Sequence, residues 1–203
     1  MSNLTATSKG AATREVILDR AYGIASQSGL EGLSIGPLAQ VVGMSKSGVF
    51  AHFGSREDLQ LAVLDSAATR FGEMVLVASL SEPRGLPRLR AIMRNWFEWV
   101  RTTVGGCILM AAASEYDDRP GPLRDRVRGN ELRWRSALQR AVQLAIDNND
   151  LSAGDAGQYV FELYAIALGV HHDAGLFGYD AARQHGDAAV ERWFAAHSPN
   201  ASR

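Results

Sequence analysis

Two short helical segments joined by a tight turn constrain this chain more than any other feature. Residues 35–42 have the pattern of a short helix, Gly43 and Met44 form a turn, and Ser45 opens a second helix. Gly43 can adopt the positive φ that ends a helix, and Ser45 can cap the next helix by accepting a backbone hydrogen bond. Ala39 has the small side chain that lets two helices cross closely. We therefore predict a helix-turn-helix in the first quarter of the chain.

The two faces of this segment differ in chemistry. Its apolar side is formed by Leu38, Val42, Met44, Val49 and Phe53. The opposite side carries Lys46, Ser47, Gly48 and His52. A short exposed helix with small, polar and basic side chains is what reading of the DNA major groove requires. We therefore expect double-stranded DNA as a partner.

The same segment resembles the DNA-binding domain of the TetR family of bacterial one-component transcriptional regulators. The landmarks that carry the resemblance are Thr13, Gly29, Ser34, Leu38, Ala39, the run from Gly43 to Phe53, and Arg56. Three positions depart from the family pattern: Phe50 stands where Tyr is usual, Ala51 where many members have His or Tyr, and Gly36 where Arg is frequent. The chain therefore lacks up to three polar contacts that are common in the family.

The exposed face and the resemblance together assign ten residues to DNA. We expect Lys46, Ser47, Gly48 and Phe50 to lie in the groove. The residues expected to hold backbone phosphates are Thr13, Arg14, Ser34, Ser45, His52 and Arg56. Phosphate contacts position a DNA-binding head without reading sequence.

The charge distribution agrees with one DNA-binding end. Residues 1–56 hold five Lys and Arg against three Asp and Glu, a net charge of +2, and the remainder holds 16 against 19, a net charge of −3. So weak a basic head favours two copies acting together. The single cysteine excludes an internal disulfide and suits a reducing cytoplasm. We expect a cytoplasmic protein with no membrane partner, because no run of about 18 apolar residues occurs.

Helical periodicity covers most of the chain, so we predict an all-α fold of about nine helices. Residues 1–12 are expected to be a flexible tail, and Thr13 to open a first helix that runs to about Ser28. Residues 13–55 then form a three-helix DNA-binding domain. Residues 56–203 form a helical effector-binding and dimerisation domain, whose first helix continues to Met74 and links the two domains.

A hydrophobic helix near the C-terminus indicates a second interface. It opens at Ser152 or Ala153, runs to about residue 176, and is apolar on nearly every side, so two of its faces must be buried. A final helix at about 181–196 could border the same surface. In the TetR family the last two long helices of two chains form a four-helix dimer interface, so the resemblance implies a homodimer. A monomer core that closes on itself is the alternative.

Aromatic and sulfur side chains in the body are spaced to line a cavity. The expected ligand-binding residues are Phe71, Met74, Trp96, Phe97, Val100, Met110, Trp134, Phe161 and Tyr164. Large rings among many Ala and Gly residues leave ligand-sized space. The resemblance places an effector between the fourth helix and the fifth to eighth, and the lining favours a small apolar or aromatic molecule. Taken singly, each residue also fits a plain core.

Three apparent chemical motifs do not predict a site. His171 and His172 point about 100° apart on a helix, so we expect no metal there. Apolar neighbours favour a buried, inert Cys107 over a redox sensor. Glu115 and residues 117–118 fit a solvated turn better than a catalytic pair. With no phosphate loop or cofactor motif, we expect neither a cofactor nor an enzyme.

The sequence thus predicts a dimeric, ligand-responsive repressor. It would bind a pseudo-palindromic operator and release it when the effector binds. A ligand-independent regulator or an activator of the same fold is the alternative, and a small helical enzyme is a more remote one.

Overall fold

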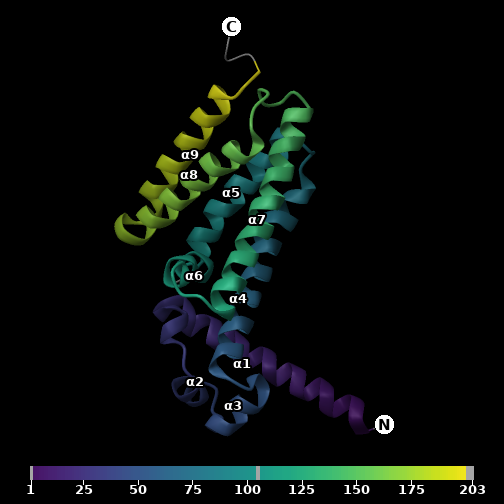
Figure 1. The fold of residues 1–203 in the computed structure, drawn as a ribbon, viewed down its shortest axis with the longest axis vertical. Helices are drawn as coiled ribbons and strands as arrows, with labels where there is room; N and C mark the ends of the chain where they lie inside the picture. Colours follow the sequence, from purple (N-terminus) through teal and green to yellow (C-terminus); the bar gives the residue numbers. More distant parts are fainter. Residues whose placement is uncertain (1, 104–105, 200–203) are drawn as a thin grey trace. The chain divides into compact units, whose positions relative to one another are not determined.

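The computed structural model describes residues 2–103 and 106–199, and the regular elements in these ranges are all helical. Nine α-helices follow one another in the described residues (Figure 1). They are α1 (Ser2–Gly32), α2 (Ile35–Val41), α3 (Lys46–Phe53), α4 (Arg56–Phe71), α5 (Leu86–Thr102), α6 (Ile108–Tyr116), α7 (Pro122–Asp147), α8 (Ala156–Phe177) and α9 (Tyr179–Ala196). A π-helical turn, η1 (Gly72–Val77), and a 3-10 turn, η2 (Ala78–Ser81), follow α4. The predicted all-α class is confirmed.

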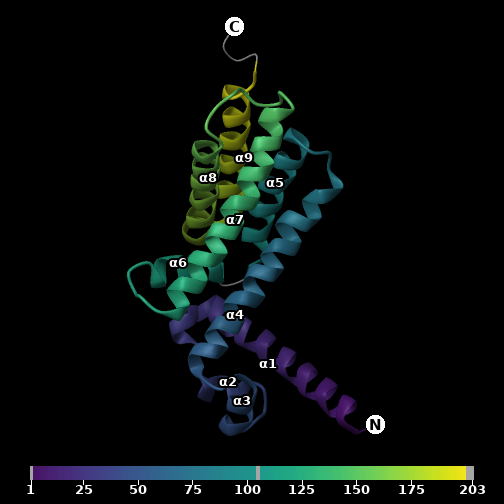
Figure 2. The same cartoon turned by 45° about the vertical axis from the view of Figure 1, so that its right-hand side comes forward.

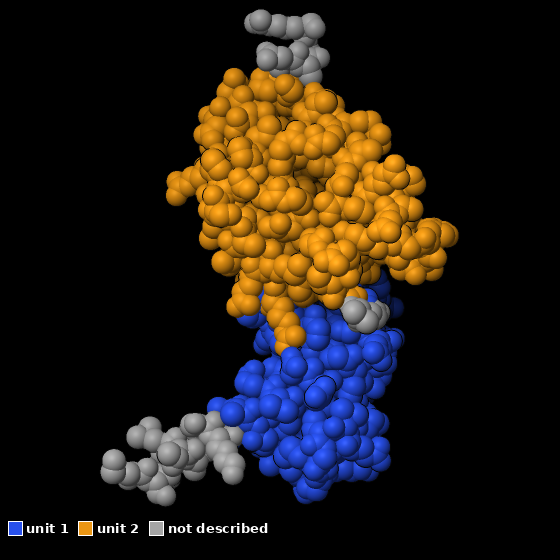
Figure 3. Space-filling view, turned by 180° about the vertical axis from the view of Figure 1, so that it is seen from behind, with its two compact units in different colours: residues 1–69, 104–129 blue, residues 70–103, 130–203 orange. Residues whose placement is uncertain are grey.

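The chain forms two compact units (Figure 3). The described part of unit 1 contains residues 2–69 and 106–129, and that of unit 2 contains residues 70–103 and 130–199. Helix α6 belongs with the N-terminal helices because it packs against α1. The domain boundary predicted between residues 55 and 56 therefore lies inside unit 1.

Unit 1 is built around the helix-turn-helix. Helix α2 packs against α1 and α3, and their apolar side chains share one core with α4 and α6. Leu38, Val49 and Phe53 are buried in this core, and Val42 and Met44 pack partly buried against it. The apolar side predicted for these two short helices is therefore confirmed.

Helix α1 extends beyond its predicted bounds at both ends. It begins at Ser2 rather than Thr13, because the segment from 2 to 12 contains no proline that would stop a helix. Those residues were expected to be a flexible tail, and Thr13 is an interior residue instead of a cap. Gly29, with φ 72° and ψ 173°, breaks the helical path near its end.

Unit 2 is a bundle in which α8 lies beside α9 and α5 contacts both (Figure 2). Gly186 of α9 permits the close approach, since a Cβ there would lie 2.3 Å from Val170 Cγ2 of α8. The indole Nε1 of Trp193 on α9 donates a hydrogen bond of 2.6 Å to Glu162 Oε2 on α8. The bundle thus combines close backbone contact with a polar tie between its two last helices.

Two helix boundaries in unit 2 differ from the periodicity. Helix α8 begins at Ala156, capped by Asp155, whose Oδ1 accepts a 2.8 Å bond from Gly157 N. The predicted start at Ser152 or Ala153 is wrong because Ser152 Oγ donates to the backbone oxygen of His197, just after α9, at 2.9 Å. The α-helical part of α4 ends at Phe71, and the apolar pattern toward Met74 continues into η1.

Candidate nucleic-acid interface

The turn before α3 has the geometry that its sequence predicts. Gly43 adopts φ 66°, and Met44 N donates a 2.9 Å bond to the oxygen of Ala39, which is 2% exposed. Ser45 Oγ accepts a 3.1 Å bond from Gly48 N and so caps α3. These local bonds fix where α3 starts relative to α2.

The exposed residues on the outer face of α3 are two small ones and one aromatic ring. Because Val49 and Phe53 are buried, the helical period turns Ser47 and Ala51 to the opposite side, with Phe50 beside them. Ser47 and Ala51 are exposed, and the Phe50 ring is 51% exposed. Of the residues predicted to face outward, Lys46 and Ser47 are exposed, whereas Gly48 and His52 are half-buried.

Lys46 lies at the border between α3 and α2. A Cβ on Gly36 would lie 3.4 Å from Lys46 Cε and 3.7 Å from its Nζ, so the lysine stem runs past Gly36. The lysine is exposed and sits at the edge of the outer face of α3. The glycine that replaces a frequent family arginine thus makes room for a different cation.

The remaining candidates for phosphate contact surround this helix. Thr13, Arg14, Ser34 and His52 are each half-buried. The Arg14 guanidinium carbon lies 4.8 Å from the centroid of the Phe53 ring, which ties α1 to α3. Ser34 precedes α2 with extended backbone, and its side chain makes no capping bond. The Ser34 hydroxyl is therefore not used in holding that helix.

Arg56 has a structural task that sequence reasoning did not find. Its Nε donates a 2.8 Å bond to Leu33 O, and its Nη2 contacts both the backbone oxygen and the carboxylate of Glu31. The start of α4 is thereby tied to the connection between α1 and α2. This guanidinium therefore stabilises the DNA-binding unit through these bonds, in addition to any contact with a phosphate.

Glu31 is the centre of a polar cluster in unit 1. The Tyr116 hydroxyl donates a 2.9 Å bond to Glu31 Oε1, and Arg119 Nη1 lies 3.7 Å from the same oxygen. The bond from Tyr116, together with the Arg56 guanidinium, holds the pKa of Glu31 below its usual value. Burial and the Glu31 carboxylate raise the pKa of Tyr116, so its hydroxyl stays a donor.

Glu115 completes this cluster from α6. Its two carboxylate oxygens accept bonds from the backbone N–H groups of Leu30, at 3.1 Å, and Glu31, at 2.9 Å. The break at Gly29 leaves these N–H groups without helical partners, and the carboxylate replaces them. The predicted solvated turn is therefore wrong for Glu115, which caps the last helical turn of α1 where it restarts after Gly29.

In unit 2, four of the predicted ligand-binding residues form one aromatic cluster. Phe71 and Trp96 each meet Trp134 edge to face, with ring centroids 4.7 Å apart in both pairs, and Trp96 meets Tyr164 at 5.4 Å. The rings interdigitate and are at least 92% buried. The Tyr164 hydroxyl donates a 2.9 Å bond to Glu131 Oε2.

Two buried donors beside this cluster have no hydrogen-bond partner among the described residues. They are Trp134 Nε1 and Asn130 Nδ2, one helical turn apart on α7. Buried donors are nearly always bonded, so both are unusual. They present the same kind of donor to the same side of α7.

The other predicted ligand-binding residues are dispersed. Met110 belongs to unit 1, and Met74 and Val100 are half-buried in unit 2. Phe161 is 61% exposed, because it lies on the face of α8 opposite the buried Val160 and Leu163. Phe161 therefore faces away from the interior of unit 2, where the prediction placed it as a ligand-binding residue.

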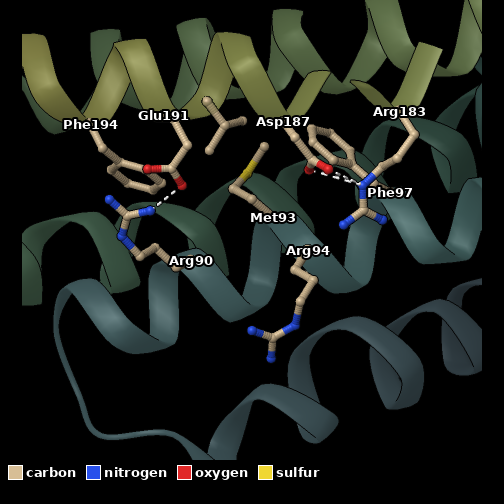
Figure 4. A pocket seen from close by; sticks show the side chains of 9 residues that line it. Arg90, Met93, Arg94, Phe97, Arg183, Asp187, Glu191 and Phe194 are labelled. Atoms are coloured by element: carbon tan, nitrogen blue, oxygen red, sulfur yellow. Dashed lines mark hydrogen bonds and ion pairs between the residues drawn. The ribbon is translucent and has the colours of Figure 1, made fainter. Parts of the chain in front are cut away.

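A separate pocket of about 230 Å³ opens between α5 and α9 (Figure 4). Its lining residues are Arg90, Met93, Arg94, Phe97, Arg183, Asp187, Val190, Glu191 and Phe194. Ion pairs Arg90–Glu191 and Arg183–Asp187 flank an apolar centre that contains Met93. Phe97 is the predicted ligand-binding residue that lies in this pocket.

The discounted motifs behave as ordinary side chains in the described residues. His172 Nδ1 lies 3.2 Å from Asp173 Oδ1, and burial lowers the pKa of His171. Cys107 is 2% exposed. Among the residues with described positions, no group of three His, Cys, Asp or Glu is placed to hold a metal, and no helix is long and apolar enough to cross a membrane.

A capped second helix with an exposed face, held in a small helical unit, defines a helix-turn-helix DNA-binding protein. Residues 17–63 match the family described as "Bacterial regulatory proteins, tetR family", and residues 85–190 match "Tetracyclin repressor-like, C-terminal domain". The second match alone covers more than half of the chain. The chain belongs to the TetR family of bacterial transcriptional regulators.

Individual relatives agree with this assignment. The HTH-type transcriptional repressor AcnR of Corynebacterium glutamicum is 32% identical over 80 residues, which are 39% of this chain and 43% of AcnR. The matched segment thus spans less than half of that relative.

Solved structures extend the similarity over nearly the whole chain. A TetR transcriptional regulator from Chloroflexus aurantiacus is 26% identical, with a TM-score of 0.82 over 93% of this chain and 96% of its own. AibR, solved in complex with isovaleryl coenzyme A and operator DNA, is 22% identical, with a TM-score of 0.71 over 92% and 98%. The identity to AibR is low enough that this likeness supports the fold alone.

Proposed function

We propose that this protein is a homodimeric transcriptional repressor that binds a pseudo-palindromic operator and is released by a small effector. The capped α3 with its exposed outer face carries the DNA-binding part of the proposal. Repression is favoured over activation by the similarity to AcnR, a transcriptional repressor. A regulator of the same fold that needs no ligand is the alternative.

Within each head, α3 enters the major groove. Ser47, Gly48 and Phe50 face the bases, and Lys46 reaches out from the α2–α3 border. Arg14, Ser34 and His52 surround α3 and hold phosphates, together with Thr13, Ser45 and Arg56. Thr13, Arg14, Ser34 and His52 are half-buried. Partial burial suits a phosphate contact, because such a contact positions the DNA-binding unit and needs a donor that is held in place.

The outer face of α8 supports the homodimer. Phe161 and Leu168, two turns apart on one face, are 61% and 42% exposed, and Leu176 further along is 65% exposed. Small residues Ala165 and Gly169 are exposed between them, which allows a second helix to approach closely. An isologous contact of two such faces would bury these side chains and give the twofold symmetry that a palindromic operator requires.

An effector site in unit 2 is supported by the aromatic cluster and its two unpartnered donors. Trp134 Nε1 and Asn130 Nδ2 would both be satisfied by an acceptor oxygen on an otherwise aromatic molecule. Such a ligand must part the rings of Phe71, Trp96 and Trp134, and the bonds it makes offset that cost. The pocket between α5 and α9 is the second place for a ligand.

Helix α4 is the proposed lever of release. Its residues divide between the two units, since the first segment of unit 1 ends at Thr69 and unit 2 begins at Arg70. A ligand that binds better to the conformation unable to engage DNA shifts the protein toward it, by the ratio of its two affinities. Operator DNA must then weaken effector binding by the same factor.

The test of DNA binding uses purified full-length protein and a duplex fragment from upstream of its own gene. We expect affinity to fall steeply as salt rises, because phosphate contacts release counterions. Lys46→Ala should weaken binding by about 1–3 kcal/mol. Arg140→Ala, which removes the same charge from an exposed position in unit 2, is the matched control and should change nothing. Equal affinity of the Lys46→Ala variant and the wild type would remove Lys46 from the interface.

A further inference from the structure

We infer that Phe50 reads the C5-methyl groups of thymine in the major groove, so that each half-site is selected partly by an apolar contact. This inference rests on the proposed binding of operator DNA by α3. It assigns a chemical preference to a position where the family usually has tyrosine.

The exposure of Phe50 is the first observation. Among residues 10–69 and 106–129 of unit 1, the large apolar side chains that are exposed are Val16, Val41 and Phe50, and Phe50 is the aromatic one. The other large apolar residues of α3, Val49 and Phe53, are 0% and 7% exposed. The Phe50 ring is therefore the large apolar side chain of α3 that a partner molecule can contact.

The polarity of its neighbours is the second observation. Ser47 Oγ is bonded to Ser45 Oγ at 3.1 Å, and Ser45 already accepts from a backbone N–H. Gly48 has no side chain, Ala51 offers a methyl group, and Lys46 runs past Gly36 at the edge. The centre of the outer face therefore has few donors or acceptors with which to distinguish base edges.

Thymine is the base that this surface fits. In the major groove, the thymine methyl is the apolar group among donors and acceptors, and Phe and Ala are side chains that contact it. Phe50 and Ala51 are neighbours on the exposed side of α3, so they can cover one methyl or two adjacent ones. Cytosine, which has an amino donor and no methyl, gives the ring nothing to bury.

The experiment first selects bound duplexes from a random-sequence pool with the full-length wild-type protein. The selected duplex is then resynthesised with deoxyuridine replacing one thymidine at a time, which removes only the methyl group. We expect one position in each half-site to lose about fourfold in affinity, the worth of burying one such carbon group. Substituting both half-sites should lose about 15-fold, because separated positions add.

Variants of Phe50 connect that loss to the side chain. Phe50→Ala should bind the selected duplex more weakly and be indifferent to deoxyuridine at the sensitive position, whereas Phe50→Leu should keep the sensitivity. Ser47→Ala changes another residue proposed to face the bases, so it should lower the overall affinity while keeping the sensitivity to deoxyuridine. Thermal melting of each variant checks folding, and Phe50→Ala should melt with the wild type because the ring is half-exposed.

The outcomes separate this inference from the proposed function. Full affinity with deoxyuridine at every thymidine, or persisting sensitivity in Phe50→Ala, overturns the methyl contact while leaving DNA binding in place. Failure to enrich any sequence, with no salt-dependent binding, overturns the proposed function itself.

Discussion

The carboxylate of Glu115 should contribute more to stability than its position near a surface turn suggests. It accepts two hydrogen bonds, from Leu30 N at 3.1 Å and from Glu31 N at 2.9 Å, where Gly29 interrupts α1. The substitution Glu115→Ala removes both acceptors and leaves the two backbone donors without protein partners.

The size of the loss follows from the surroundings of the two bonds. A hydrogen bond to a charged group contributes about 1.5–3 kcal/mol. The bond from Leu30 is partly buried and should count in full, whereas the bond from Glu31 is exposed and water can replace it. We therefore expect a destabilisation of about 2–4 kcal/mol. For a chain of 203 residues this lowers the melting temperature by about 4–16 °C.

Thermal and denaturant unfolding of the wild type and three variants would measure it. Glu115→Gln keeps one neutral acceptor and should lose less than Glu115→Ala. Asp118→Ala removes an equally charged, exposed carboxylate from the same segment and should melt with the wild type. If Glu115→Ala melts within about 1 °C of the wild type, the carboxylate does not hold the end of α1, and the reasoning from the Gly29 break fails.

Three further predictions concern assembly, effector and pH. Leu168→Glu should raise the dimer dissociation constant by more than about 100-fold, since an unpaired buried carboxylate costs several kcal/mol. Analytical ultracentrifugation measures this constant, and Leu80→Glu, at another exposed leucine of unit 2, is the control. Acetophenone, which has an acceptor oxygen, should quench tryptophan fluorescence and stabilise the protein by about 2.7 kcal/mol at a hundredfold excess over its Kd. Ethylbenzene at the same concentration should bind more weakly and stabilise the protein less. Trp134→Ala should abolish that effect without loss of DNA affinity; equal shifts with both compounds would contradict the role of the two donors. Because the pKa of Glu31 is lowered in the folded protein, its stabilising contribution is complete above the unfolded pKa of about 4.3 and is lost as the pH falls through the folded value. The free energy of unfolding of the Glu31→Gln variant should therefore depend less on pH below about pH 5 than that of the wild type.

The helix-turn-helix was predictable because its signals are local. Gly43, Ser45 and Ala39 act through bonds and contacts within a few residues, so their neighbours in the sequence specify what they do. The same holds for the alternation of buried and exposed residues on α3. The glycine turn and the serine cap specify where the first helix ends and where the second begins, and both act through neighbouring residues.

The polar cluster of unit 1 was not predictable, because its partners are distant in the sequence. Glu115 bonds to residues 84 and 85 positions away, and Arg56 reaches back to Leu33 and Glu31. In the sequence, Glu115 lies before two aspartates and looks like part of a solvated turn. Only a glycine inside an otherwise regular helix, Gly29, signalled that some distant group must satisfy the interrupted backbone.

The faces of α8 were ambiguous for a related reason. In a helix that is apolar on every side, the sequence does not show which face is buried, so periodicity could not predict that Tyr164 is buried and Phe161 exposed. The fold decides it, with Tyr164 buried against Trp96 and Phe161 exposed. Likewise, the sequence allowed Ser152 to cap α8, but in the fold its hydroxyl donates a hydrogen bond to His197 O at the end of α9.

The contact of Lys46 with Gly36 links two positions in evolutionary change. A side chain at residue 36 would contact the Lys46 stem, since a Cβ there would lie 3.4 Å from Lys46 Cε, an ordinary van der Waals distance. An arginine introduced at 36, as in many family members, would therefore lie against the lysine stem. The effects of substitutions at these two positions on operator affinity should then be coupled, because residues in contact do not act additively.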